Sequence, residues 1–180
     1  SSLKPLAVYA PALENGMSPA SIILNFAQPI EGYGGSRGYP TGGLSSQGPV
    51  TMRKSVVSSL NVGVARVLFE NVTPAASKNY LVSMGMDPDT IFADGPGLAL
   101  GTSGISMLEL TAAFSTLSNG GVYQSPIAFT VVKDSQGNVV LDAEKFRTTA
   151  QIFKKSTAWL MTDMLIDAVK SGTGRKARID

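Results

Sequence analysis

The sequence contains neither cysteine nor histidine. Without cysteine, the chain forms no disulfide and offers no thiolate to a metal. Without histidine, it excludes a Ser-His-Asp triad, a histidine general base and a His-ligated zinc. A serine nucleophile would therefore take its base from lysine, from a carboxylate or from the chain's own amino terminus, and we expect no cofactor or metal.

Charge is also scarce, because charged residues make up 16% of the chain and the net charge is only +2. The basic residues are scattered, which argues against a nucleic-acid partner. No apolar run approaches the roughly 18 residues of a membrane span. Hydrophobic residues reach 43%, enough for a core, and so little charge predicts surface that packs on other polypeptide. The chain begins without Met inside a predicted helix, so we expect a piece of a longer protein.

Helical signals dominate the chain. Apolar periodicity predicts a first helix over residues 1–15 that ends at Gly16; Pro5 is tolerated in its first turn, whereas Pro11 predicts a kink or a break. Capping and stop signals predict further helices at about 51–59, 62–72, 73–84, 106–119 and 156–171. In the helix that follows Ser106, the apolar positions expected to be buried are Leu108, Leu110, Ala113, Phe114 and Leu117.

Few strands are expected. A β-hairpin is predicted from residues 127–133 and 139–141 around a turn at 134–138, giving a hairpin near 127–141. A long Gly-, Pro- and Ser-rich loop over 17–49 holds one short predicted strand at 22–26, and residues 86–104 form a second predicted loop. The predicted fold class is mainly α with one β-hairpin.

The first four residues, Ser1-Ser2-Leu3-Lys4, place a hydroxyl and an amine three positions apart. On a helix these positions share a face, so both side chains can converge. A serine hydroxyl becomes a good nucleophile when a desolvated lysine with a lowered pKa removes its proton. A Ser-x-x-Lys quartet is also expected about once by chance in a chain of this composition, so the quartet alone decides little.

A second pair, Ser59 and Asn61, lies between two predicted helices. In an extended turn, residues two apart point to the same side, where they could pass a proton and hold a substrate amide. Taken alone, the pair is better explained as an ordinary helix cap, for which Ser and Asn are preferred.

A resemblance adds to these two motifs. Segments along nearly the whole chain resemble the transpeptidase domain of class A penicillin-binding proteins, in family order. The segments are SSLKPL followed by YAPALENG, GPVTMR leading to SSLN and AR at 65–66, LALG at 98–101, ISMLELTAAF, NGGVY, TAWLMTDML and GTG at 172–174.

The resemblance implies a function and a site. Ser1 matches the serine that attacks the D-Ala-D-Ala carbonyl of a peptidoglycan stem peptide or a β-lactam ring, and Lys4 matches the lysine that activates it. Ser59 and Asn61 match the motif that relays protons and orients the substrate amide. The implied parent is anchored at the extracytoplasmic face of a bacterial membrane, with a glycosyltransferase domain upstream.

One family motif is missing. No Lys-[Ser/Thr]-Gly strand follows the Gly-Thr-Gly segment, and Lys170-Ser-Gly172 is better explained as the end of a helix. The resemblance therefore implies that residues 1–180 are a partial transpeptidase (β-lactamase-like) domain, its helical part, with the central sheet largely missing. Since that strand supplies part of the oxyanion hole, we expect the isolated chain to be inactive and to pack against the remainder of its own domain.

Three alternatives remain at this point. An N-terminal-nucleophile hydrolase would use Ser1 with its own amine, but it needs a sheet directly after Ser1. A homologue without activity would act as a structural or partner-binding piece. A soluble β-lactamase shares the Ser-Lys chemistry, but no residue here clearly matches a deacylating glutamate.

Overall fold

The computed structural model describes residues 2–26, 29 and 48–179. The helices are η1 (Pro5–Tyr9, a π-helix), α1 (Ala10–Glu14), α2 (Met52–Val57), α3 (Asn61–Val67), η3 (Leu68–Val72, a π-helix), α4 (Pro74–Ser83), α5 (Gly97–Leu100), α6 (Met107–Ser118) and α7 (Lys155–Ser171). Three 3₁₀ turns complete the set: η4 (Pro88–Thr90), η5 (Ala143–Lys145) and η6 (Arg175–Ala177).

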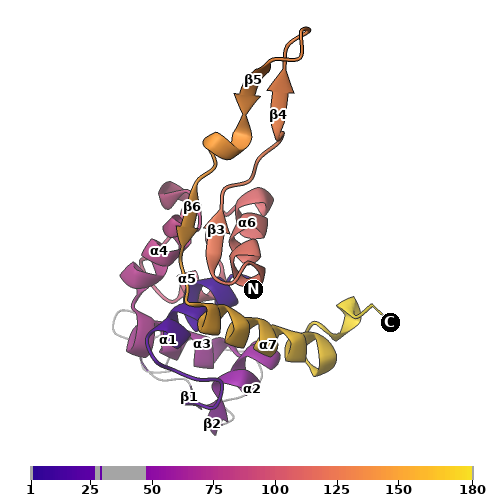
Figure 1. Cartoon of the computed structure of the whole chain (residues 1–180). Helices are drawn as coiled ribbons and strands as arrows, with labels where there is room; N and C mark the ends of the chain where they lie inside the picture. Colours follow the sequence, from indigo (N-terminus) through magenta and orange to yellow (C-terminus); the bar gives the residue numbers. More distant parts are fainter. Residues whose placement is uncertain (1, 27–28, 30–47, 180) are drawn as a thin grey trace.

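The strands form three separate antiparallel pairs. β1 (Ile22–Asn25) pairs with β2 (Gly48–Thr51), β3 (Val122–Gln124) with β6 (Thr149–Gln151), and β4 (Val131–Lys133) with β5 (Val139–Asp142). The β4–β5 hairpin projects from the helical body, which also holds the other two pairs (Figure 1). The mainly helical class and the hairpin are confirmed, whereas strand β2 and the β3–β6 pair are additions that the sequence did not predict.

The first helix lies at the centre of the body. Residues from Leu6 to Ala10 are each at most 1% exposed, so this helix is buried on every side rather than along one stripe. Pro11 does not break it: the π-helical turns of η1 pass directly into α1. Because Pro11 has no N–H, the Ala7 carbonyl accepts a hydrogen bond from the Ser77 hydroxyl instead, at 2.6 Å.

Local caps set several helix starts as predicted. The hydroxyl of Thr51 accepts from the Lys54 amide, and the hydroxyl of Thr73 accepts from the Ala76 amide. Ser106 forms a reciprocal capping box with Glu109 at the start of α6. These short-range signals are legible in the sequence because both partners lie within one turn.

Two expectations were wrong. Leu108, predicted to be buried, is 64% exposed. The face of α6 that meets the core runs through Ala113 and Leu117, and the apolar residues of its first turn extend beyond that face. The loop expected at 86–104 contains the 3₁₀ turn η4 and the helix α5, whose four residues are too few for periodicity to reveal. The greater part of the glycine-rich loop, residues 30–47, lies outside the described residues.

Candidate active site around Lys4, Ser59 and Asn61

The Lys4 side chain ends at the turn between α2 and α3. Its Nζ donates to the Ser59 carbonyl at 2.7 Å, to Ser59 Oγ at 3.1 Å and to Asn61 Oδ1 at 2.6 Å. Lys4 is 3% exposed, so nearly all of the side chain is removed from water. The fold therefore brings together three of the four residues singled out in the sequence. The fourth, Ser1, lies outside the described residues.

The turn that presents Ser59 is a Schellman motif at the end of α2. The Leu60 amide donates to the Ser55 carbonyl and the Ser59 amide to the Val56 carbonyl, which satisfies two helix-end acceptors. Ser59 occupies the left-handed position with φ 52°, where glycine is the usual residue. Ser59 thus keeps a side chain where glycine would relieve the strain, and its hydroxyl accepts a hydrogen bond from Lys4.

The capping explanation for Ser59 and Asn61 does not hold. The residue that precedes α3 is Leu60, and no side chain at that position caps the helix. Asn61 is the first residue of α3 and its amide oxygen instead accepts from Lys4. Both polar side chains are therefore oriented toward the amine rather than toward helix-end amides.

Burial changes the acidity of the Lys4 amine. Desolvation disfavours the charged form and lowers the pKa of Lys4 from 10.5 to about 8. With that pKa, roughly one lysine in ten is neutral at pH 7, compared with fewer than about one in a thousand for an ordinary lysine. A neutral amine in this position can accept a proton from a neighbouring hydroxyl.

A pocket of about 240 Å³ opens beside Lys4 and Ser59. Its wall includes Ser2, Phe114 and Thr173, which come from three distant parts of the chain. Thr173 is fixed there by its amide, which donates to the Val57 carbonyl at 3.1 Å. The sequence had marked this Gly-Thr-Gly segment only as part of a resemblance, and its packing against the end of α2 carries no local signal.

Gly172 is required for that packing. A Cβ at this position would lie 2.3 Å from the Val57 carbonyl oxygen and 2.9 Å from the Ala168 carbonyl oxygen. The backbone after α7 therefore approaches α2 more closely than any side chain would allow.

The protein-family model of the penicillin-binding protein transpeptidase domain matches residues 1–180 of this chain. The chain is 34% identical over 177 residues to penicillin-binding protein 1F of Bacillus subtilis, an alignment that covers 96% of this chain and 23% of that protein. It is 31% identical over 192 aligned positions to penicillin-binding protein 1A of Clostridium perfringens strain 13, covering 99% of this chain and 28% of that protein.

The chain belongs to the penicillin-binding protein transpeptidase family. It spans about a quarter of the length of these curated relatives, 23% and 28%. The predicted family membership is confirmed, and so is a fold that corresponds to the helical portion of the domain.

Solved structures support the fold of this penicillin-binding domain. Penicillin-binding protein 1A from Haemophilus influenzae superposes with a TM-score of 0.81 at 22% identity, covering 97% of this chain and 30% of that one. Penicillin-binding protein A from Mycobacterium tuberculosis, solved as an imipenem acyl-enzyme complex, gives a TM-score of 0.76 at 16% identity, covering 99% of this chain and 45% of that one. At these identities the likeness concerns the fold alone.

The start of the described chain bears on one of the alternatives, and two other kinds of feature are absent from the described residues. The described residues that follow Ser1 form a helix rather than a strand, which is the opposite of what an N-terminal-nucleophile hydrolase requires. Within residues 2–26, 29 and 48–179, no cluster of acidic residues is placed to hold a metal ion, and no helix is long and apolar enough to cross a bilayer.

Proposed function

We propose that residues 1–180 are the helical part of a serine D,D-transpeptidase domain that cross-links peptidoglycan stem peptides. The observation that carries this proposal is a buried lysine amine held by Ser59 and Asn61, three positions after Ser1 in the sequence. Lysine with a lowered pKa replaces the histidine that the chain lacks. The family match over the whole chain supports the same reaction class.

The proposed reaction has two halves. In the first, the neutral Lys4 amine takes the proton of the Ser1 hydroxyl while Ser1 Oγ bonds to the penultimate D-Ala carbonyl. The proton then passes through Ser59 Oγ to the departing D-Ala nitrogen as the peptide C–N bond breaks, and Asn61 holds the substrate amide. In the second half, an amine of a neighbouring stem peptide attacks the ester carbonyl and loses a proton to the same relay. The ester C–O bond breaks, and the relay returns the proton to Ser1 Oγ.

β-Lactams enter by the same chemistry. Their strained amide would acylate Ser1 in place of the stem peptide, leaving an ester that no second substrate removes. An imipenem acyl-enzyme has been solved for penicillin-binding protein A of Mycobacterium tuberculosis, which shares this fold. We propose the same drug class as ligands of the complete domain here.

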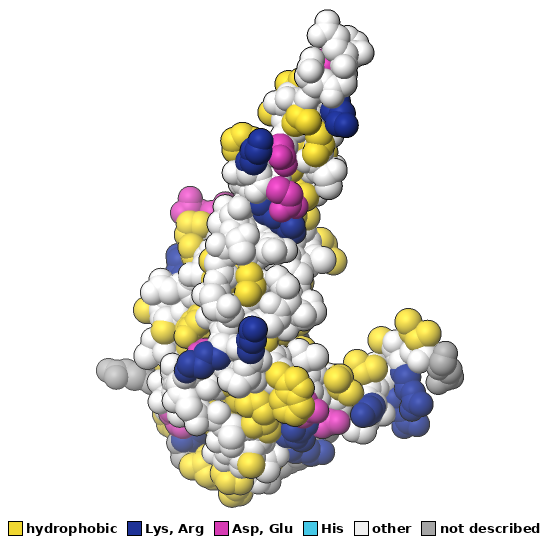
Figure 2. Space-filling model, viewed as in Figure 1, with side chains coloured by type: hydrophobic (Ala, Val, Ile, Leu, Met, Phe, Trp, Pro, Cys, Tyr) yellow, Lys and Arg dark blue, Asp and Glu magenta, His cyan; other side chains and the backbone are white. Residues whose placement is uncertain are grey.

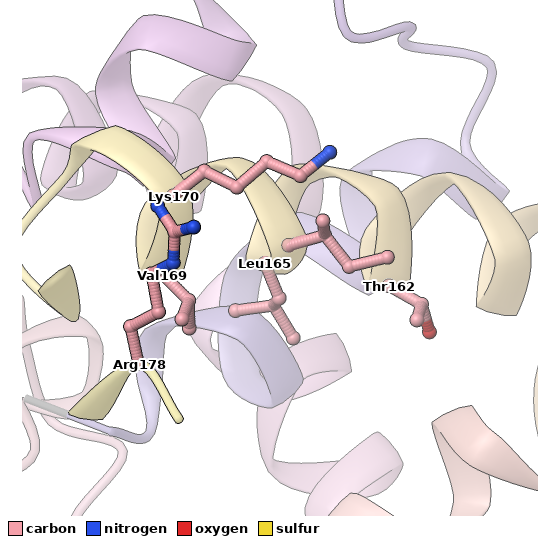
Figure 3. Close-up of a pocket in the computed structure, with 6 residues that line it drawn as sticks. Thr162, Leu165, Val169, Lys170 and Arg178 are labelled. Atoms are coloured by element: carbon pink, nitrogen blue, oxygen red, sulfur yellow. The ribbon is translucent and has the colours of Figure 1, made fainter. Parts of the chain in front are cut away.

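The remainder of the same domain is the proposed partner of α7. A groove of about 670 Å³ runs along this helix, lined by Leu165, Ile166 and Val169 and bordered by Lys170 and Arg178. Figure 3 shows Arg178, from the C-terminal segment, beside Val169 of α7. Hydrophobic side chains are also visible toward the C-terminal end of the chain in Figure 2. The family's third-motif strand, with its share of the oxyanion hole, is proposed to belong to the polypeptide that covers this groove.

Peptidoglycan lies outside the cell membrane, so we place the working domain at the extracytoplasmic face of a membrane-anchored parent. Acylation of the longer protein that contains this chain tests the function. Fluorescent penicillin should label it at a single site, mass spectrometry should locate the ester on Ser1, and Ser1→Ala should abolish labelling. An ester on a different side chain, or undiminished labelling of Ser1→Ala, would refute the assignment.

The isolated 180-residue chain provides the matched comparison. It should not hydrolyse a D-Ala-D-Ala thioester analogue, because the proposed oxyanion donors are incomplete. Steady hydrolysis by the pure chain would show that the missing motif is unnecessary.

A further inference from the structure

Two polar side chains are buried close to the Ser59–Asn61 turn, although neither belongs to the motifs discussed above. Ser55 is 0% exposed and Asn25 is 2% exposed. Burying a hydroxyl or an amide costs free energy unless its hydrogen bonds are satisfied. Their partners therefore indicate what the two side chains are for.

Ser55 connects the two halves of the site. Its Oγ lies 2.8 Å from the hydroxyl of Tyr9, a residue of the same central helix that carries Lys4. Its carbonyl accepts from the Leu60 amide at 3.0 Å, inside the turn that presents Ser59. One residue thus ties the helix of the lysine to the turn that holds the lysine's acceptors.

Asn25 fixes the other side of the turn. Its Oδ1 accepts from the Gly63 amide at 3.0 Å, in the first turn of α3. Since Leu60 precedes this helix and has no side-chain acceptor, Asn25 of β1 supplies the cap from a distant strand. Anchoring the first turn of α3 also anchors its first residue, Asn61.

Gly63 lies beside both anchors. A Cβ at this position would lie 2.7 Å from Ser55 Oγ and 3.4 Å from Asn25 Oδ1. Glycine therefore lets Ser55 Oγ approach the start of α3 this closely, whereas 3.4 Å from Asn25 Oδ1 would be an ordinary contact. The buried hydrogen bonds and the glycine therefore form one continuous support under the turn.

We propose that Ser55 and Asn25 are positioning residues, which hold the Ser59 and Asn61 oxygens at hydrogen-bonding distance from Lys4 Nζ. They touch no substrate and act through the turn. Hydrogen bonds weaken steeply beyond about 3.2 Å, so a displacement of one ångström would break the 3.1 Å contact between Lys4 and Ser59 Oγ that the proton relay uses. This inference rests on the proposed transpeptidase function.

The test uses the longer protein that contains this chain and measures its acylation by fluorescent penicillin. Ser55→Ala should lower the acylation rate constant about tenfold and leave the noncovalent dissociation constant unchanged, because geometry rather than binding is lost. Tyr9→Phe removes the same hydrogen bond from its other end. The double variant should therefore be no slower than either single variant, a non-additivity that independent losses of packing would not give.

Ser77→Ala is the matched control. Ser77 is equally buried and its hydroxyl also bonds the central helix, at the Ala7 carbonyl, but it has no hydrogen bond to the turn. It should lower the melting temperature without the tenfold loss in acylation rate. For the second anchor, Asn25→Asp keeps an acceptor for Gly63 and should be faster than Asn25→Leu.

The outcomes separate the two proposals. Acylation of Ser55→Ala at the unchanged rate, or an equal loss in Ser77→Ala, overturns the positioning role while the function stands. Additive losses in Ser55→Ala and Tyr9→Phe overturn it as well. If the unsubstituted longer protein is not acylated, the proposed function fails and the positioning role fails with it.

Discussion

The left-handed backbone at Ser59 predicts that substitutions there change stability and acylation independently. Ser59 has φ 52° at the end of α2, and replacing it with either Gly or Ala removes the hydroxyl that Lys4 contacts. The two variants differ only in whether the left-handed conformation stays strained. Comparing them therefore isolates the backbone term from the hydrogen bond.

The magnitude follows from two opposing terms. A left-handed conformation costs a residue with a Cβ about 1–2 kcal/mol, which Gly avoids. Gly gives back about 0.4–1 kcal/mol through the larger entropy of its unfolded chain. Ser59→Gly should therefore be more stable than Ser59→Ala by about 1 kcal/mol, or about 2–4 °C in melting temperature for a domain of this size.

Urea denaturation followed by circular dichroism measures the difference. Ser58 is the matched control, since this neighbouring residue has an ordinary φ of −92°, and there Gly should be less stable than Ala by about 0.5–1 kcal/mol. Equal stability of the two Ser59 variants, or the same sign at both positions, would refute the argument from strain. In the longer protein, both Ser59 variants should be acylated at least about 10²-fold more slowly than the unsubstituted protein, because the relay hydroxyl is gone. The greater stability of Ser59→Gly should not restore the acylation rate.

Three further predictions test other parts of the structure. Burial lowers the pKa of Lys4 from 10.5 to about 8, so between these pH values the unfolded chain binds more protons than the folded chain. The unfolding free energy should therefore rise with pH across that window, relative to the Lys4→Met variant. A pH-independent difference between the two proteins would contradict the buried amine. Burial alone would raise the pKa of Glu14, but hydrogen bonds from Thr157 and Lys154 hold it below its ordinary value of 4.5. The contribution of Glu14 to the unfolding free energy is therefore present above pH 4.5 and is lost as the pH falls through the lowered pKa. Glu14→Gln should cost about 1–2 kcal/mol in denaturant unfolding at pH 7 and show a smaller loss of stability in acid, whereas a parallel acid profile would count against this role. Gly172→Ala should lower the unfolding free energy by about 1–3 kcal/mol, because the new Cβ collides with the Val57 carbonyl oxygen. Gly104→Ala is the control, since among the described residues no atom beyond its chain neighbours lies within 4 Å of a Cβ placed there. Equal melting temperatures of the two variants would show that the close approach at Gly172 is absent.

The exposed hairpin and the α7 groove mark where the described residues lack a covering layer. The hairpin presents Val139, Val140 and Leu141 with roughly half of their surface exposed. Figure 2 shows hydrophobic side chains along this projection. The groove along α7 is larger than the pocket at Lys4. Both agree with the low charge of the sequence, which had predicted surface that packs against other polypeptide.

The sequence by itself determined most of the helices and their boundaries, although not α5. Thr51, Thr73 and Ser106 mark helix starts, and Gly16 marks an end, because each signal acts within one turn of the backbone. It also offered Lys4, Ser59 and Asn61 as candidates, through short motifs and a resemblance. The role of Ser1 remains a prediction from the same motifs.

Only the tertiary structure decided which of these groups meet. Lys4 and Ser59 are 55 positions apart, and no periodicity or cap relates them. The supports at Ser55 and Asn25 had no signal of their own, since a serine inside a helix and an asparagine in a strand usually face water. Their burial, the strain at Ser59 and the lowered pKa of Lys4 all arise from long-range packing, which local sequence spacing does not encode.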